Sequence, residues 1–277
     1  MKWLQFILSH SIFIAGCAAA LCLQTVQLLD ISADIYLYGF VFFATLCSYN
    51  FYWLLSKYFF HSDITALAEF FRKEAVQFFV FAVSCAGTVF CYYHSSLSPY
   101  FVLPAVLLTI LYAIPLLPFK SIRFTRKAGV LKTVLLAFTW TYVTAFIPIQ
   151  KEIDALGTTD IFILSRRFLF MLMLCIIFDS RDIAVDKIRG LRSLATDLAP
   201  KTLRYLILTI FIILFATNFL SLRYGISVSQ SIALQITTIA LLVAYYFSTK
   251  KQGYFFYYFF IDGLMLFSAL ATYIASI

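Results

Sequence analysis

The sequence predicts an all-α membrane protein, a polytopic helical bundle of nine transmembrane helices, on three observations. Of the 277 residues, 63% are hydrophobic and 12% are charged, about half the charged share of an ordinary soluble domain. The charges fall between long uncharged segments, and these segments lack the polar–apolar alternation of barrel strands. Because a chain in hydrocarbon must satisfy its own backbone hydrogen bonds, each segment is predicted to be a helix.

Nine segments, each near the ~20 residues that cross a bilayer as a helix, lie between clusters of charged or turn residues. The apolar run of the first segment is too long for a cleavable signal peptide. We therefore interpret residues 1–277 as a single transmembrane domain. The predicted spans are residues 3–29, 33–60, 75–93, 97–119, 130–149, 160–182, 202–222, 229–249 and 254–276.

The lysines and arginines predict the orientation, because positive side chains collect on the cytoplasmic side of a membrane. With a cytoplasmic N-terminus, seventeen of the 21 basic residues fall on that side. Only Lys151, Arg166, Arg167 and Arg223 fall on the other. This favours nine spans over eight in a multi-pass protein of the cytoplasmic membrane. The net charge of +8 is spread over several short loops, which is not the pattern of a nucleic-acid-binding surface.

Cysteine and histidine indicate neither a redox site nor a zinc site. All six cysteines lie inside predicted spans without a Cys-x-x-Cys pair, and we interpret them as packing residues. The three histidines, His10, His61 and His94, are scattered along the chain and do not have the spacing of metal ligands.

An acidic segment follows the sixth span, from Phe178 to Gly190. On a helix, Asp179, Asp182 and Asp186 fall within an arc of about 60°. Carboxylates stacked in this way repel one another unless a cation lies between them, and ligands that are all oxygen favour Mg²⁺. We interpret the three aspartates as metal ligands and catalytic residues.

The alternative is a solvated loop in which these aspartates pair with Arg181, Lys187 and Arg189. Depth favours the metal site, because only eleven uncharged residues separate Arg167 from Asp179. They form ~17 Å of helix, which is shorter than the ~30 Å hydrocarbon core. One end of this stretch must therefore lie at membrane depth, where ionisable residues face a polar cavity or the protein interior.

The segment from Lys120 to Lys132, which covers the loop between the fourth and fifth spans and the start of the fifth, carries five basic residues and no acidic one. Orientation by the positive-inside bias accounts for most of them. We predict that Lys120 and Arg123, nearest the membrane, bind a diphosphate, because such side chains neutralise phosphoryl oxygens and a departing pyrophosphate.

At these positions the sequence resembles the UbiA superfamily of intramembrane prenyltransferases. These are nine-helix proteins in which two Asp-rich motifs, after the second and sixth helices, hold Mg²⁺ and an isoprenyl diphosphate. The resemblance covers most of the chain, and its specific part is Asp179-x-x-Asp182-x-x-x-Asp186-x-x-x-Gly190. Supporting matches are Pro118-Phe119-Lys120, Arg123-Phe124-Thr125, Lys132, Trp140 and Asp262-Gly263.

The first motif of the family, Asn-Asp-x-x-Asp-x-x-x-Asp, is degenerate in this chain. Asn50 is kept, but Phe51, Leu54 and Tyr58 occupy the three acidic positions. Lys57 projects from the same helical face as Asn50. We hypothesise that Asn50 and Lys57 bind the substrate, with the Lys57 ammonium supplying the charge that a metal ion would give the diphosphate. The alternative is an interfacial lysine that extends to the lipid headgroups.

Other acidic residues are candidates with less support. Asp63, Glu69 and Glu74 follow the second span, at a spacing that matches no motif. Asp262 lies eight residues into the ninth span, and an intramembrane carboxylate is a substrate-binding candidate by default. A structural role, hydrogen-bonded between helices, is equally open for it.

The resemblance implies a transferase with Mg²⁺ as its cofactor and its site on the cytoplasmic side. An isoprenyl group would pass from an isoprenyl diphosphate to a lipophilic acceptor, aromatic or lipid, while aromatic side chains line the isoprenoid tunnel. The degenerate motif favours an alternative, a carrier or accessory protein that binds an isoprenoid or lipid diphosphate without catalysis. A third interpretation, a small-molecule transporter, is weakened by the lack of charge pairs along several helices.

Overall fold

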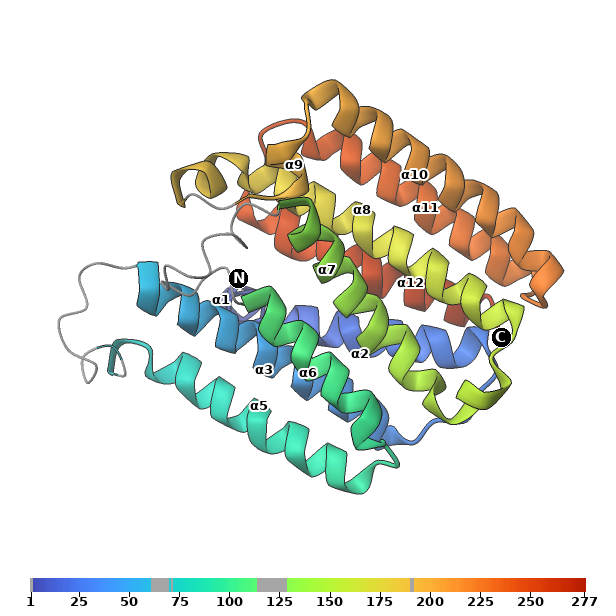
Figure 1. Ribbon diagram of the computed structural model, residues 1–277, viewed down its shortest axis with the longest axis horizontal. Helices are drawn as coiled ribbons and strands as arrows, with labels where there is room; N and C mark the ends of the chain where they lie inside the picture. Colours follow the sequence, from blue (N-terminus) through green and yellow to red (C-terminus); the bar gives the residue numbers. More distant parts are fainter. Residues whose placement is uncertain (1, 61–69, 71, 114–128, 190–191) are drawn as a thin grey trace.

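The computed structural model describes residues 2–60, 70, 72–113, 129–189 and 192–277, and the regular elements in these ranges are all helical. The long helices run side by side in roughly one direction (Figure 1). The all-α prediction is therefore confirmed. Several predicted residues, namely His61, Asp63, Glu69, Lys120 and Arg123, lie outside the described residues.

Helices occupy each of the nine predicted places. The α-helices are α1 (Lys2–Ser9), α2 (Ile12–Leu28), α3 (Ile35–Phe60), α5 (Ala75–His94), α6 (Pro99–Ala113), α7 (Gly129–Thr141), α8 (Thr158–Arg189), α9 (Leu194–Asp197), α10 (Pro200–Leu220), α11 (Val228–Ser248) and α12 (Asp262–Ile274). Two π-helical turns, η4 (Tyr142–Phe146) and η7 (Phe256–Ile261), and two 3₁₀ segments, η5 (Ile147–Ala155) and η6 (Ser221–Tyr224), join them.

Length and composition show a multi-pass membrane protein. Six of the described helical segments are long and apolar enough to cross a bilayer, and the number is seven if α1 and α2 form one bent span. The described part of α6 is apolar but has 15 residues. The 26-residue α3 contains Asn50, Lys57 and several tyrosines, which lower its hydropathy. The count of nine spans and the cytoplasmic N-terminus remain predictions.

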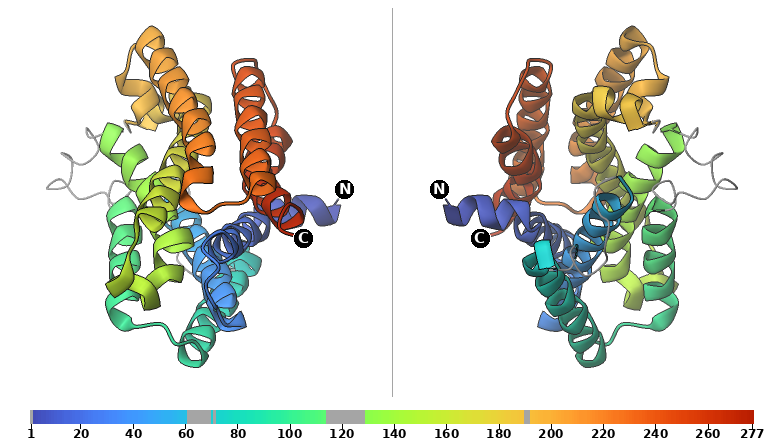
Figure 2. Two further views of the ribbon diagram at one scale, coloured as in Figure 1. Left: turned by 90° about the vertical axis from the view of Figure 1, so that its right-hand side faces the viewer. Right: turned by 90° about the vertical axis from the view of Figure 1, so that its left-hand side faces the viewer.

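The first predicted span is not one continuous helix, and this prediction is corrected. α1 and α2 meet at an angle of 69° because Ser11 takes a left-handed backbone conformation with φ 63°. α1 projects sideways from the bundle (Figure 2), with Trp3 exposed and Leu8 buried. A short amphipathic helix at this angle is typical of one that lies along a membrane interface.

In Figure 1, α8 lies between α7 on one side and α10 and α11 on the other. Residues 170–177 are buried around the whole circumference of this helix, as expected for a helix surrounded by others. Because α8 also carries Arg166 and Arg167 before this buried stretch and the three predicted aspartates after it, it places charge at two different levels of the bundle.

Small residues allow the outer helices to approach closely. A Cβ atom on Gly87 of α5 would lie 2.6 Å from the ring of Phe43 on α3. The Sγ atoms of Cys47 and Cys85 lie 3.4 Å apart across the same pair of helices. All six cysteines are free, and four of them are buried, which agrees with their interpretation as packing residues.

Candidate functional site at the end of the sixth predicted span

Asp179, Asp182 and Asp186 all lie in α8, which continues as a helix to Arg189, beyond the predicted end of the span at residue 182. Asp186 is buried, whereas Asp182 is partly exposed. The hydroxyl of Thr133, on α7, donates a hydrogen bond to Oδ2 of Asp179. Asp182 and Asp186 lie within electrostatic range of Asp179. We call the end of the bundle that holds these three carboxylates the acidic end.

Asp182 is paired with the residue that precedes it. Arg181 donates two hydrogen bonds, from Nε and Nη2, to the two oxygens of this carboxylate, each at 2.7 Å. The Arg181 guanidinium also lies 5.0 Å from the ring centres of Phe178, Tyr257 and Tyr258. Aromatic faces attract a cation, so the Arg181 side chain is held on several sides. The pairing with Arg181 that the loop interpretation expected is therefore present, but within a helix.

The arrangement of the carboxylates does not fit a metal ion held by all three. In the part of the chain that the structure describes, no group of three or more His, Cys, Asp or Glu side chains is disposed to hold a metal. Both oxygens of Asp182 face Arg181, so Asp182 would have to leave that partner to become a ligand. The Mg²⁺ site remains a prediction.

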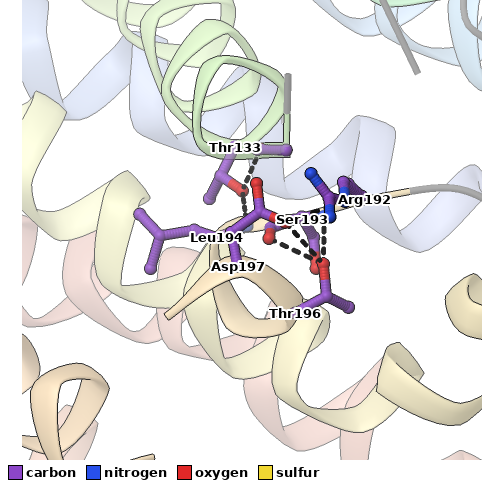
Figure 3. A network of polar contacts seen from close by, with 7 residues as sticks. Thr133, Arg192, Ser193, Leu194, Thr196 and Asp197 are labelled. Carbon is purple, nitrogen blue, oxygen red and sulfur yellow. Dashed lines mark hydrogen bonds and ion pairs between the residues drawn. The ribbon is translucent and has the colours of Figure 1, made fainter. Parts of the chain in front are cut away.

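A polar network joins Thr133 of α7 to the segment that follows α8 (Figure 3). The Thr133 hydroxyl, which donates to Asp179, also accepts a hydrogen bond from the backbone N–H of Leu194 at 3.0 Å. At the start of α9, the Ser193 N–H donates to Oγ1 of Thr196 at 2.8 Å. Thr133 therefore links α7, α8 and α9 at a single oxygen atom.

Gly129, the first residue of α7, permits this contact. A Cβ atom there would lie 2.6 Å from Oδ2 of Asp197 and 2.6 Å from the backbone nitrogen of Ser193. Asp197 is itself held by Arg192, with 3.5 Å between Nε and Oδ1. Sequence reasoning missed Gly129 and Thr133, because a glycine or threonine at the start of an apolar span carries no distinguishing pattern.

Asn50 is buried in a helix junction and its side chain is fully engaged there. Its Nδ2 donates to the backbone oxygens of Leu46, at 2.7 Å, and His10, at 3.2 Å, and its Oδ1 accepts from Gln77. These bonds connect α3 to α5 and to the bend between α1 and α2. They describe a packing role for Asn50, whereas its substrate-binding role remains a prediction.

Lys57 forms an ion pair with Glu74, and its ammonium lies 4.6 Å from the centre of the Trp53 ring. The Lys57 ammonium, which was predicted to bind a diphosphate, is therefore paired with the carboxylate of Glu74, the residue just before α5. Neither predicted role of Lys57 requires this pair, and the spacing of Lys57 and Glu74 in the sequence did not indicate it.

Asp262 begins α12 directly after the π-helical turn η7 and is buried, with 6% of its surface exposed. Arg181, Cys17 and Tyr49 lie within electrostatic range of it. Arg181 thus lies near a second carboxylate besides Asp182. Asp262 therefore lies near the acidic end, and its substrate-binding role remains a prediction beside the structural one.

An apolar cavity of about 450 Å³ lies between α3, α5, α6 and α7, within the size range of small-molecule sites. Its walls include two aromatic pairs, Tyr49 with Trp140 and Tyr52 with Tyr112, with ring centres 6.2 Å and 5.2 Å apart. Of these, Tyr112 is within electrostatic range of Asp179, and Tyr49 is within range of Asp262. The cavity therefore adjoins the carboxylates of the acidic end.

These features define a multi-pass helical membrane protein with an apolar cavity beside a charged end. The chain has the UbiA-type fold. It matches the solved apo structure of a UbiA homologue from Aeropyrum pernix K1 with a TM-score of 0.58 over 97% of each chain, at 14% sequence identity. The sequence matches no protein-family model and no curated protein. The resemblance seen in the sequence is thus confirmed as a shared fold.

Proposed function

We propose that the protein is a UbiA-like prenyltransferase that transfers an isoprenyl group from an isoprenyl diphosphate to a lipophilic acceptor in the membrane. The observation that carries this proposal is the aromatic cavity beside Asp179 and Asp262. The isoprenoid chain would lie in the cavity, with its diphosphate at the acidic end, on the cytoplasmic side.

In the proposed reaction, the bond between C1 of the isoprenyl group and the diphosphate oxygen breaks, and pyrophosphate leaves with the bonding electrons. C1 bonds to a nucleophilic atom of the acceptor, and the proton that this atom loses passes to the departing pyrophosphate. Positive charge develops on the isoprenyl carbons, and the faces of Tyr49 and Trp140 would stabilise it. Lys132, within electrostatic range of Asp179, Arg181, Lys120 and Arg123 would neutralise the departing pyrophosphate. Asp182, whose two oxygens face Arg181, would have to leave that partner before it could hold Mg²⁺.

A second function, a carrier or accessory protein for an isoprenoid or lipid diphosphate, is supported by a specific observation. Asp182 is neutralised by Arg181, and the acidic positions of the first motif hold Phe51, Leu54 and Tyr58. Such a protein would use the same cavity and the same basic residues, but would release the diphosphate unchanged.

The two functions differ in pyrophosphate release. Purified protein is incubated with radiolabelled geranylgeranyl or farnesyl diphosphate, Mg²⁺ and a lipid extract, and binding, pyrophosphate and labelled lipid are measured. We expect release by wild type and its loss in Asp182→Ala. Asp30→Asn is the matched control, because Asp30 is exposed after α2 and its φ of 51° suits asparagine. Binding without release identifies the carrier, and the absence of binding contradicts both functions.

A second experiment tests the cavity. Ala105 is buried in the cavity wall, so Ala105→Phe would fill the space proposed for the isoprenoid. Leu103, on the same helix, is 70% exposed, and Leu103→Phe is the control. We expect weaker binding of the labelled diphosphate in Ala105→Phe alone. Equal binding by both variants would place the isoprenoid elsewhere.

A further inference from the structure

α8 carries a pair of buried arginines far from the acidic end. Arg166 and Arg167 follow the start of the helix by about 12 Å, and 3% and 2% of their surfaces are exposed. The ion pairs found in the described part of the chain involve neither of them. Charged side chains within a membrane-spanning helix are costly and mark functional sites by default.

The two arginines differ in how their donors are used. Arg167 is directed toward α2 and η4, where neutral oxygens accept its hydrogen bonds. Its acceptors are the backbone oxygen of Leu21 (3.1 Å) and the side-chain oxygens of Gln24 (2.8 Å), Thr25 (3.3 Å) and Thr144 (3.3 Å). Arg167 is therefore a structural connection between helices.

Arg166 is directed toward α10 instead. Its Nε donates a hydrogen bond to Oδ1 of Asn218 at 2.7 Å. Its Nη2 is buried and has no hydrogen-bond partner among the described residues. A buried donor without an acceptor is rare in folded proteins, and more so when it belongs to a charged group.

The polar side chains near Arg166 form hydrogen bonds with one another and with the backbone. Asn218 donates to Oε1 of Gln235 at 3.1 Å and to Oγ1 of Thr238 at 2.9 Å, and Gln235 donates to the backbone oxygen of Phe215 at 3.0 Å. This cluster is neutral, so it offers Arg166 hydrogen bonding without a counter-charge. Within this cluster, Nη2 of the positively charged Arg166 is the donor that has no acceptor.

We propose that Arg166 binds an anionic oxygen, of a phosphate or carboxylate group, at a site between α8, α10 and α11. A water molecule would satisfy the donor, but an anion satisfies both the donor and the charge. The ligand is either a lipid headgroup or a free anion. The outer faces of α10 and α11 expose Ile212, Phe219, Ile232 and Ile236, so a ligand with acyl chains can reach this region from the bilayer. This arginine site does not depend on the proposed function.

The test compares the full-length protein in three environments. These are nanodiscs of phosphatidylcholine alone, the same nanodiscs with added inorganic phosphate, and nanodiscs that also contain phosphatidylglycerol. The melting temperature is measured in each, and native mass spectrometry identifies retained lipid or phosphate. Arg166→Gln removes the charge, and Arg223→Gln is the control, because Arg223 lies exposed in η6, which contacts the start of α8.

We expect one of the two anions to raise the melting temperature of wild type and Arg223→Gln by about 5 °C near saturation, and to leave Arg166→Gln unchanged. A response to phosphatidylglycerol alone identifies a lipid headgroup, and a response to phosphate identifies a free anion. An equal rise in Arg166→Gln, or no rise and no retained anion in wild type, overturns the proposal.

A second variant keeps the test decisive if Arg166→Gln does not fold. Asn218→Asp places a carboxylate beside Arg166, at the position that already accepts its Nε hydrogen bond. This internal counter-charge should abolish the response to the anion. If Asn218→Asp responds to the anion as strongly as wild type, the anion does not bind at Arg166.

Discussion

The acidic end and the arginine site lie on the same helix, and they neutralise charge in opposite ways. At the acidic end, Arg181 pairs with Asp182, its neighbour in the sequence. About 21–24 Å along α8 from this pair, Arg166 and Arg167 bond to neutral amides, hydroxyls and carbonyls of α2, η4 and α10. An ion pair between adjacent residues, such as Arg181 and Asp182, can be recognised in the sequence. Hydrogen bonds from a charged side chain to neutral groups on distant helices can be recognised only in the folded structure.

Among substitutions that test this comparison, we expect the largest loss of stability from Arg167→Gln. Arg167→Gln removes a side chain whose bonds join α8 to α2 and η4 and leaves several buried acceptors unpaired. We expect the free energy of unfolding to fall by about 3 kcal/mol or more, measured by thermal or denaturant unfolding in detergent. Arg223→Gln, at an exposed site, should change it by less than about 0.5 kcal/mol. Equal stabilities would show that neutral oxygens contribute little.

The next largest effect is expected at Gly129. Gly129→Ala forces a Cβ atom against Asp197 and Ser193, and such overpacking costs about 1–3 kcal/mol. The matched control is Gly16→Ala in α2, where an added Cβ meets no atom within 4 Å. We expect a lower melting temperature than wild type for Gly129→Ala and an unchanged one for Gly16→Ala. A stable Gly129→Ala would mean that the segment after α8 is free to move away from α7.

A smaller effect is expected at Thr133. Thr133→Val removes the hydrogen bond to Asp179 and leaves the Leu194 N–H without its acceptor, at a cost of about 1–2 kcal/mol. Thr141→Val on the same helix removes only a bond to the Ala137 carbonyl, and Thr141 does not line the cavity. Binding of labelled isoprenyl diphosphate should weaken more in Thr133→Val than in Thr141→Val. If the two variants bind equally, Thr133 does not position Asp179.

The smallest effect on stability is expected at the Lys57–Glu74 pair, because partly exposed ion pairs contribute about 0–1 kcal/mol. Lys57→Gln and Glu74→Gln separate the two roles of the lysine. If the ammonium serves a diphosphate, Lys57→Gln weakens binding of the labelled diphosphate and Glu74→Gln strengthens it. If it serves only the ion pair, neither variant changes binding across a Mg²⁺ titration.

The helix positions could be predicted because a bilayer demands about 20 apolar residues for each span. The helical stripe of Asp179, Asp182 and Asp186 followed from its spacing, and the short distance from Arg167 to Asp179 indicated charge at membrane depth. The partners of these charges could not be predicted. Gln24, Thr144 and Asn218 are ordinary polar residues within apolar segments, and only their three-dimensional neighbours make them acceptors. The bend at Ser11 could not be predicted either, because no glycine or proline marks this position in the sequence.

The π-helical turn η4 sets a length requirement on its helix. A π turn contains an extra residue compared with an α-helical turn, so side chains beyond it are rotated by about 100° from where an uninterrupted helix would place them. Thr133 lies before this turn and bonds to Asp179, whereas Thr144 lies within it and bonds to Arg167. Deleting Tyr142 or Val143 would shorten the stretch between the two threonines by one residue and move them out of register. The number of residues here therefore matters as much as their identity.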